Sequence, residues 1–417
     1  MITDQARLAD LLGRIRRFVE EVAIPNEEEV ERQDRVGEPI IAELRRLGSF
    51  GWSIPRAYGG SELSQEELAL AFIELSQCSV AYRVVGAQNA GIGSECLICD
   101  GTAEQKQKYL PRLATGELIG CLAVTEESAG SDATALKTRA QRLANGDYLL
   151  NGSKRYITLA PIAGLFTVLA RSDDRQRGAA GISAFLLERG TPGLSTSEQT
   201  RKMGQEGAPI GEVYFTDCRV PANSIIGLAA GQGFSTVMKC LNKQRLNLAA
   251  LSTGPAIRLL NEGIAYARER QQSGRPIGEF QLVQAMLAEC KVEIEASRAL
   301  ILETARKRDR GDDVTMDVSL CKYWQPKCAV VSPTASCKSS AARATSRGAA
   351  SSASTVTFAP PASMRAPARS ISSTSPSNSC ASCLASHRCY RAAVEPLAAL
   401  ALNRYSHRGG RRACAWR

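Results

Sequence analysis

The spacing of apolar residues changes twice along this chain, from helical to strand-like and back to helical. In the first 119 residues they recur with the period of an amphipathic helix. Between 120 and 228 the period falls to two residues, which is typical of strands. This order predicts an α+β, multidomain protein. Its parts would be an N-terminal α-helical domain (1–119), a central antiparallel β-barrel or β-sandwich domain (120–228) and a C-terminal helical bundle (229–324).

Local signals place some elements more closely. Capping boxes at Ser64/Glu67 and Thr102/Gln105 predict helix starts, and the run 273–276 breaks two long helical patterns. Asn-Gly pairs at 145–146 and 151–152 predict tight turns between strands. Short apolar runs predict strands at 148–150, 166–170, 182–187 and 213–215.

The charge of the chain is concentrated at one end. The formal net charge is +10, but residues 325–417 hold 13 of the 52 Lys and Arg residues and only Glu395 among the 42 acidic residues. Residues 1–324 therefore carry 39 basic and 41 acidic residues, a net charge of −2. Since this part has no basic excess, we expect no nucleic-acid partner for it.

Cysteine usage and hydropathy argue against a metal-binding, secreted or membrane-spanning protein. Within residues 1–324 the C-x-x-C at Cys96–Cys99 has no second pair, and both histidines, His387 and His407, lie after residue 324. We therefore interpret the cysteines as reduced thiols and expect no metal. The first twenty residues resemble an amphipathic helix rather than a signal peptide, and no apolar run is long enough for a bilayer. We therefore expect a cytoplasmic protein with no membrane partner.

Six short motifs occur in order along the first 324 residues. They are "LAVTEESAGSD" (122–132), "YIT" (156–158), "KMGQEGA" (202–208), "DCRVP" (217–221), "GQGF" (231–234) and "RQQSGRPIGEFQLVQ" (270–284). "GQGF" alone is a poor dinucleotide fingerprint, because no strand leads into it and no third glycine follows. Taken together, in this order and on these successive helical and strand-like patterns, the motifs closely resemble those of the acyl-CoA dehydrogenase family.

The resemblance implies FAD as the cofactor, held between the β-domain and the helical bundle. The segment from Leu122 to Ser131 would lie along the flavin, with Thr125 near the N5/O4 edge of its ring and Ser131 reaching both flavin phosphate and substrate. Tyr156, Ile157 and Thr158 would cover the other side of the ring. The cofactor residues that the family implies are Leu122, Val124, Thr125, Gly130, Ser131, Tyr156, Ile157, Thr158, Arg270, Gln272 and Gln281.

The resemblance also implies an acyl-CoA substrate and a homo-oligomer, a dimer or a tetramer. Ser131, Asn242 and Arg245 would bind the substrate, whereas Arg270, Gln272 and Gln281 would reach the flavin's pyrophosphate and adenosine half in a neighbouring subunit. Short hydroxyl groups donate to a flavin that gains negative charge as it accepts hydride, and an arginine neutralises pyrophosphate. Electron-transferring flavoprotein would be the electron acceptor.

Three residues depart from the family pattern. Glu127 stands where the family often has proline, and Tyr156 and Leu159 stand where Trp and Asn are usual. Arg83 lies near the place where relatives specific for dicarboxylic substrates carry a carboxylate-binding arginine, but one residue out of register. We interpret Arg83 as a surface or helix-packing residue.

The catalytic base of the family is missing from the expected places. Members remove the α-proton of the acyl chain with a glutamate, held either in a C-terminal Tyr-Glu-Gly-Thr motif or, in one branch, beside the arginine that matches Arg245. Here that neighbour is Gln244, which cannot take a proton, and no such motif follows Trp324.

A shifted reading frame supplies the missing motif. Read from the third base of each codon, residues 363–370 admit "YEGTS(Q/E)I", with the base codon across Met364 and Arg365. The same shift admits "QI-GGAGY" across 337–345, "YRD" across 354–358 and "(A/T)EM" across 325–328. Loss of one G after the Trp324 codon explains all four, so we interpret residues 325–417 as a frameshift product that forms a disordered tail.

This interpretation has consequences for function. The protein would be an acyl-CoA dehydrogenase by descent, desaturating an acyl-CoA thioester with FAD, but inactive as translated. Its bundle would lack its closing helices, leaving the apolar faces around Ile294, Leu300 and Leu302 without cover. One alternative is a non-catalytic flavin or acyl-CoA binding protein with a genuine basic interaction tail. An acyl-CoA oxidase, whose reduced flavin reacts rapidly with oxygen, is another.

Overall fold

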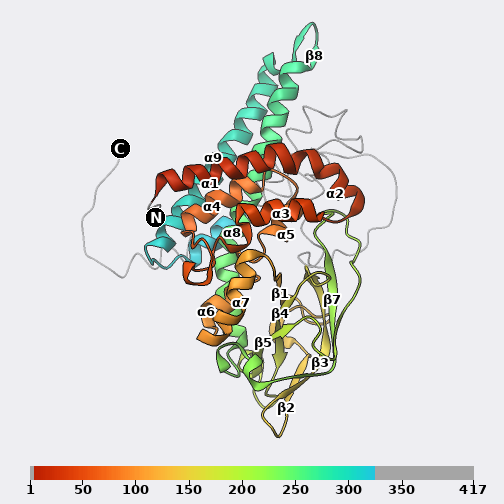
Figure 1. The fold of residues 1–417 in the computed structure, drawn as a ribbon. Helices are drawn as coiled ribbons and strands as arrows, with labels where there is room; N and C mark the ends of the chain where they lie inside the picture. The colour runs from red at the N-terminus through yellow and green to blue at the C-terminus, as the bar shows by residue number, and fades with distance from the viewer. Residues whose placement is uncertain (1–3, 325–417) are drawn as a thin grey trace, which may run out of the picture. The chain divides into compact units, whose positions relative to one another are not determined.

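The structure, a computed structural model, describes residues 4–324. The predictions made for residues 325–417 lie outside the described residues. Helices form the first part of the chain, a curled sheet the middle and long helices the last part, so the predicted fold class is confirmed (Figure 1). None of the helices in residues 4–324 is both long and apolar enough to cross a bilayer.

The N-terminal part consists of short helices whose starts follow from local sequence. Both predicted capping boxes form: the Ser64 hydroxyl accepts from the Glu67 N–H while the Glu67 carboxylate accepts from the Ser64 N–H, and Thr102 and Gln105 pair in the same way. The helices are α1 (Gln5–Arg17), α2 (Glu27–Gln33), α3 (Glu38–Leu47), α4 (Gln65–Leu75), α5 (Val80–Gly86), α6 (Glu95–Asp100) and α7 (Ala103–Thr115).

The middle of the chain forms one seven-stranded mixed sheet in the order β1-β4-β2-β3-β7-β6, with β5 pairing β4. Four predicted strands are confirmed within β3, β4, β5 and β7. The sheet is not wholly antiparallel, because β1 and β4 pair in parallel. The strands are β1 (Gly120–Ala123), β2 (Arg139–Arg142), β3 (Tyr148–Thr158), β4 (Leu165–Arg171), β5 (Ile182–Glu188), β6 (Leu194–Thr196) and β7 (Ile210–Val220).

One of the two predicted turns is wrong. Asn145-Gly146 does turn the chain between β2 and β3, with Gly146 at φ +91°. Asn151-Gly152 instead lies inside β3, where the register with β7 shifts between Leu150 and Gly152. A Cβ at Gly152 would lie 2.8 Å from the Thr138 Cα. The glycine therefore marks a bulge where two backbones approach closely, which a turn dipeptide also suits.

The last part is built on two long antiparallel helices, α8 (Gly233–Glu269) and α9 (Gln281–Asp309). The break predicted at 273–276 is a small hairpin of β8 (Gln271–Gln272) and β9 (Arg275–Pro276). Figure 1 shows this hairpin at the end of α8 and α9 that lies away from the sheet. A further helix begins at residue 315 and continues to residue 324.

The prediction of an uncovered face around Ile294 is wrong. Ile294 is 1% exposed and packs with Ala256, Leu260 and Cys290 between α8 and α9, while Leu300 and Leu302 lie half-buried against the main helical core. The pattern alone did not show which face of α9 meets α8. Leu282 (80% exposed) and Val292 (68%) lie on the open side of α9 instead.

A hydrophobic cluster joins the sheet to helices that precede it and follow it in the sequence. It contains buried residues of α6, α7, β4, β5 and α8, and Leu122 and Val124 pack against it at the end of β1. Val237 and Cys240 of α8 belong to the same cluster. This packing joins the end of β1 and the first turns of α8 in one cluster.

Candidate functional site

The segment after β1 is folded back on itself. Glu126 and Ala129 exchange backbone hydrogen bonds, with the Glu126 N–H 2.9 Å from the Ala129 oxygen and the Ala129 N–H 3.3 Å from the Glu126 oxygen. Gly130 and Ser131 follow this turn and are exposed. Apolar Leu122 and Val124 therefore face the hydrophobic cluster, while the end of the motif meets solvent.

A buried ion pair lies beneath this segment. The Lys154 side chain on β3 is 0% exposed, and its Nζ lies 2.8 Å from Glu126 Oε1 and 3.1 Å from the Val124 carbonyl oxygen. Burial lowers the pKa of Lys154 to about 8, against the opposing effect of the Glu126 carboxylate. Burial alone would raise the pKa of Glu126, but the Lys154 ammonium and the surrounding hydrogen bonds outweigh it and lower the pKa.

Glu126 uses its remaining acceptor sites on the two residues that precede β2. Its carboxylate accepts from the Thr138 hydroxyl at 2.6 Å and from the backbone N–H groups of Lys137 and Thr138 at 2.6 and 3.0 Å. The pair is thus satisfied on all sides, as a buried charge requires. Sequence reasoning missed it, although a lysine at an inward position of a period-2 strand was a usable signal.

The motif at 156–158 runs beside the first segment. The Arg155 N–H donates to the Thr125 carbonyl oxygen at 2.8 Å. A register shift between Lys154 and Ile157 puts Tyr156 in the left-handed region at φ +58°, where its ring is 51% exposed under the Arg155 guanidinium. Ile157 is buried and Thr158 half-buried. The structure therefore brings together two of the predicted cofactor segments.

Leu159 occupies a position that suits the asparagine usual in the family. Its φ is +64°, a conformation that Asn tolerates and that costs other residues about 1–2 kcal/mol. The Leu159 side chain is 0% exposed in the helical core. Burial of a leucine contributes about 1.5–3 kcal/mol, which offsets the backbone cost.

The hydroxyl groups predicted to face a flavin are available. Within residues 4–324, the side chains of Thr125, Ser131 and Thr158 make no hydrogen bond, whereas the hydroxyls of Thr134 and Thr138 nearby are engaged. Free donors of this kind suit the carbonyl, ring-nitrogen and phosphate acceptors of FAD. The donor set therefore fits the group that the sequence predicts.

The predicted substrate residues lie on α8. Arg245 Nη1 donates to Asn242 Oδ1 at 2.7 Å, and Arg308 of α9 donates to the Asn242 carbonyl oxygen at 3.2 Å. Gln244 faces the loop before α6, since a Cβ at Gly91 would lie 2.5 Å from Gln244 Oε1. Gln244 Oε1 also accepts from Asn247 Nδ2 at 3.2 Å, so the amide has a structural contact at the place of the family's alternative base.

Arg270, Gln272 and Gln281 are not part of this cluster. They are exposed at the β8–β9 hairpin and the start of α9, away from the sheet (Figure 1). The structure thus brings together the residues predicted on 122–131 and 156–158 and leaves these three apart. Residues 242–245 directly follow the part of α8 that packs in the same cluster as Leu122 and Val124.

Arg83 on α5 is not a surface residue. It is half-buried, its Nε is buried without a hydrogen-bond partner among residues 4–324, and burial lowers its pKa to about 10. No acidic side chain in the described residues forms an ion pair with it. The surface interpretation is therefore wrong, and the helix-packing interpretation leaves a cation without a counter-charge.

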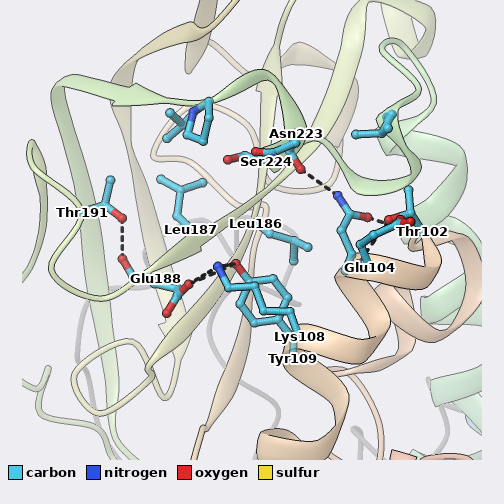
Figure 2. Close-up of a pocket in the computed structure, with 14 residues that line it drawn as sticks. Thr102, Glu104, Lys108, Tyr109, Leu186, Leu187, Glu188, Thr191, Asn223 and Ser224 are labelled. Carbon is cyan, nitrogen blue, oxygen red and sulfur yellow. Dashed lines mark hydrogen bonds and ion pairs between the residues drawn. The ribbon is translucent and has the colours of Figure 1, made fainter.

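A cavity of about 410 Å³ lies elsewhere, between α7 and β5 (Figure 2). Lys108 Nζ pairs with Glu188 Oε1 at 2.7 Å, and the Tyr109 hydroxyl donates to the same carboxylate at 3.2 Å. None of the residues predicted for flavin or substrate lines it. Its lining holds one lysine, Lys108, and two carboxylates, Glu104 and Glu188.

Comparison with known proteins places this architecture in one class. Three family models match successive parts of the chain: the acyl-CoA dehydrogenase N-terminal domain at residues 6–117, the middle domain at 121–218 and the C-terminal domain at 231–332. The chain belongs to the acyl-CoA dehydrogenase family and is an FAD-dependent oxidoreductase.

Individual relatives agree with this assignment. The mitochondrial 2-methylacyl-CoA dehydrogenase of Solanum tuberosum is 36% identical over 300 residues, which are 71% of this chain and 72% of the relative. Butyryl-CoA dehydrogenase of Megasphaera elsdenii has a similar structure, with a TM-score of 0.81 and 30% identity over 85% of this chain and 93% of that one. A chain in a structure of the electron-transferring flavoprotein of Acidaminococcus fermentans has the same TM-score, 31% identity and the same coverage.

Proposed function

We propose that this chain descends from an enzyme that desaturates an acyl-CoA thioester between its α and β carbons with FAD. The observation that carries the proposal is that the Arg155 N–H to Thr125 carbonyl bond joins the two predicted cofactor segments. Together these segments hold three hydroxyls, of Thr125, Ser131 and Thr158, that make no hydrogen bond within residues 4–324. Bound FAD would supply the acceptor for the hydride that leaves the β carbon.

The chain's own residues would hold the reactants. The hydroxyls of Thr125 and Thr158 would donate to the polar edge of the flavin ring. The segment from Leu122 to Ser131 would lie along the flavin, and Tyr156 and Ile157 would cover the other side of the ring. Gly130 and Ser131, exposed after the turn, would approach the flavin phosphate, and Ser131 would also contact the substrate. Asn242 and Arg245, already bonded to each other, would bind the acyl-CoA.

The translated chain would lack the step that removes the α-proton. A glutamine cannot act as a general base, and Gln244 already contacts Asn247 and the Gly91 loop. The base codon that we place across Met364 and Arg365 is out of frame. The loss of a positioned base costs about 10²–10⁴ in rate, so we expect the chain as printed to be inactive or nearly so.

Partners and domain organisation follow from the same proposal. The exposed Arg270, Gln272 and Gln281 lie far from the other cofactor residues, which supports a role toward the FAD of a second copy and hence a homo-oligomer. Electron-transferring flavoprotein would accept the electrons; a similar structure carries that name. The proposed domains are 1–119, 120–228 and 229–324, followed by 325–417.

One observation favours a second function. The carboxylate of the alternative base is replaced by the Gln244 amide, which is held in place by Asn247. A non-catalytic flavin or acyl-CoA binding protein needs no base. This alternative predicts that the chain as printed binds FAD fully and that correction of the reading frame adds no activity.

Restoration of the reading frame separates the two. Insertion of one G after the Trp324 codon should give a yellow, oligomeric protein whose flavin absorbance is bleached anaerobically by a saturated acyl-CoA. The chain as printed should carry little FAD and should not bleach. Full FAD and equal turnover in the chain as printed would refute the frameshift, whereas no bleaching of a flavin-loaded, repaired chain by any acyl-CoA would refute the dehydrogenase function.

A further inference from the structure

The Lys154–Glu126 pair connects the two segments that the proposed function places on either side of the flavin. Lys154 lies two residues before Tyr156 on β3, and Glu126 lies one residue after Thr125. The ammonium also donates to the Val124 carbonyl oxygen at 3.1 Å. One buried charge thus fixes backbone and side chain of the first segment from within the second.

The contact with Val124 sets the direction of the next N–H group. In a planar trans peptide, the carbonyl and the following N–H point in opposite directions. Because Lys154 draws the Val124 carbonyl oxygen toward the interior, the Thr125 N–H points away from Lys154. Within residues 4–324 this N–H has no hydrogen-bond partner, and neither has the Thr125 hydroxyl.

The peptide group that follows Thr125 is engaged. The Thr125 carbonyl accepts from the Arg155 N–H, and the Glu126 N–H donates to the Ala129 carbonyl. The backbone on both sides of the Thr125 N–H is thus fixed, which leaves this group and the Thr125 hydroxyl as a pair of oriented, unused donors. Donors that are held before a ligand arrives cost no reorganisation on binding.

We propose that the Lys154–Glu126 pair is a positioning element that orients the N–H and hydroxyl of Thr125 toward the flavin ring. The inference rests on the proposed function, and neither residue would itself touch the cofactor. A buried pair is weak evidence for stability, because well-packed apolar residues often replace such a pair without loss. Its effect here is on the orientation of the two segments.

The test compares Lys154→Met with the double variant Lys154→Met/Glu126→Leu, in which an apolar pair replaces the charges. Arg258→Met is the matched control, since Arg258 forms a similarly buried pair with Glu27 in the helical part of the chain. Three quantities are measured on the full chain: deuterium uptake of peptides covering 122–131 and 154–158, the midpoint of thermal unfolding, and the Kd for added FAD, in the printed and the frame-repaired chain.

We expect Lys154→Met to raise deuterium uptake in both segments and to raise the Kd for FAD by about tenfold or more, the effect of one hydrogen bond to a charged group. The double variant should recover the unfolding midpoint but not the FAD affinity. Arg258→Met should leave the uptake of both segments and the Kd unchanged.

Several results would overturn the proposal. They are wild-type uptake in Lys154→Met, recovery of FAD affinity together with stability in the double variant, or equal weakening of FAD binding by Arg258→Met. If the double variant does not fold, the deuterium uptake and the Kd for FAD of Lys154→Met, compared with those of Arg258→Met, still test the proposal. If neither the printed nor the repaired wild-type chain binds FAD, the proposed function fails, and the uptake of the two segments alone tests whether the pair holds them.

Discussion

Glu27 should contribute far more to stability than Glu262, although both carboxylates pair with Arg258. The Arg258 side chain on α8 is 10% exposed, and its two terminal nitrogens lie 2.7 and 2.9 Å from the two Glu27 oxygens. Glu27 also accepts from the Ser79 N–H, which precedes α5. One carboxylate therefore joins three helices that are distant in the sequence.

The magnitude follows from burial. Removal of one partner of a buried pair costs about 3–5 kcal/mol, because the other charge stays buried and unpaired. In Glu27→Ala the Arg258 Nε keeps Glu262 Oε1 at 2.8 Å, so the cost should lie near the lower end, about 3 kcal/mol. Glu262 is 37% exposed and pairs with Arg258 across one helical turn, for which about 0.5 kcal/mol is typical.

Urea unfolding followed by far-UV circular dichroism measures both variants against the wild-type chain. Glu27→Gln is the graded control, since it keeps an acceptor for the Ser79 N–H and should lose about half as much as Glu27→Ala. If Glu262→Ala lowers the unfolding midpoint as much as Glu27→Ala, the argument from burial is wrong. A Glu27→Ala effect below 1 kcal/mol would have the same meaning.

Three further predictions concern the site. Burial lowers the pKa of Lys154 from its ordinary 10.5 to about 8, so between these values the unfolded chain binds more protons than the folded chain and stability should rise with pH. The urea midpoint of the wild-type chain, measured relative to that of Lys154→Met, should therefore be higher at pH 9.5 than at pH 7.5. A wild-type midpoint that does not rise relative to the variant's would contradict this prediction. Arg83→Met should raise the midpoint by removing an uncompensated cation; in the repaired chain, loss confined to glutaryl-CoA would indicate carboxylate recognition, and equal loss on butyryl-CoA would exclude it. The Gln244→Glu prediction uses the frame-repaired chain in which the restored catalytic glutamate is changed to glutamine. In that background Gln244→Glu should raise the rate of anaerobic flavin bleaching by about 10². An unchanged rate in a flavin-loaded protein would show that position 244 cannot reach the α-proton.

Much of the fold was predictable because its signals are local. A capping box joins residues three apart, and the period of apolar side chains reports the secondary structure in which they lie. Ser64/Glu67 and Thr102/Gln105 open helices as predicted, the break at 273–276 separates α8 from α9, and the order of motifs identified the family.

Contacts between distant residues were beyond the sequence. Which face of α9 meets α8 depends on the packing of both helices, and it buries Ile294 while leaving Val292 exposed. Gly152 satisfies a turn and a bulge equally well until the approach of Thr138 is known.

The candidate site divides in the same way. The sequence determined which hydroxyls and apolar residues stand in the motifs, because a motif is a run of neighbours. Only the tertiary structure decided that Lys154 and Glu126, 28 positions apart, share one buried contact. It also decided that the β8–β9 hairpin, which Arg270 directly precedes, lies at the end of α8 and α9 away from the sheet (Figure 1). Burial and pairing of charges depend on which residues the folded chain brings together, and no local sequence pattern encodes a contact between residues far apart in the chain.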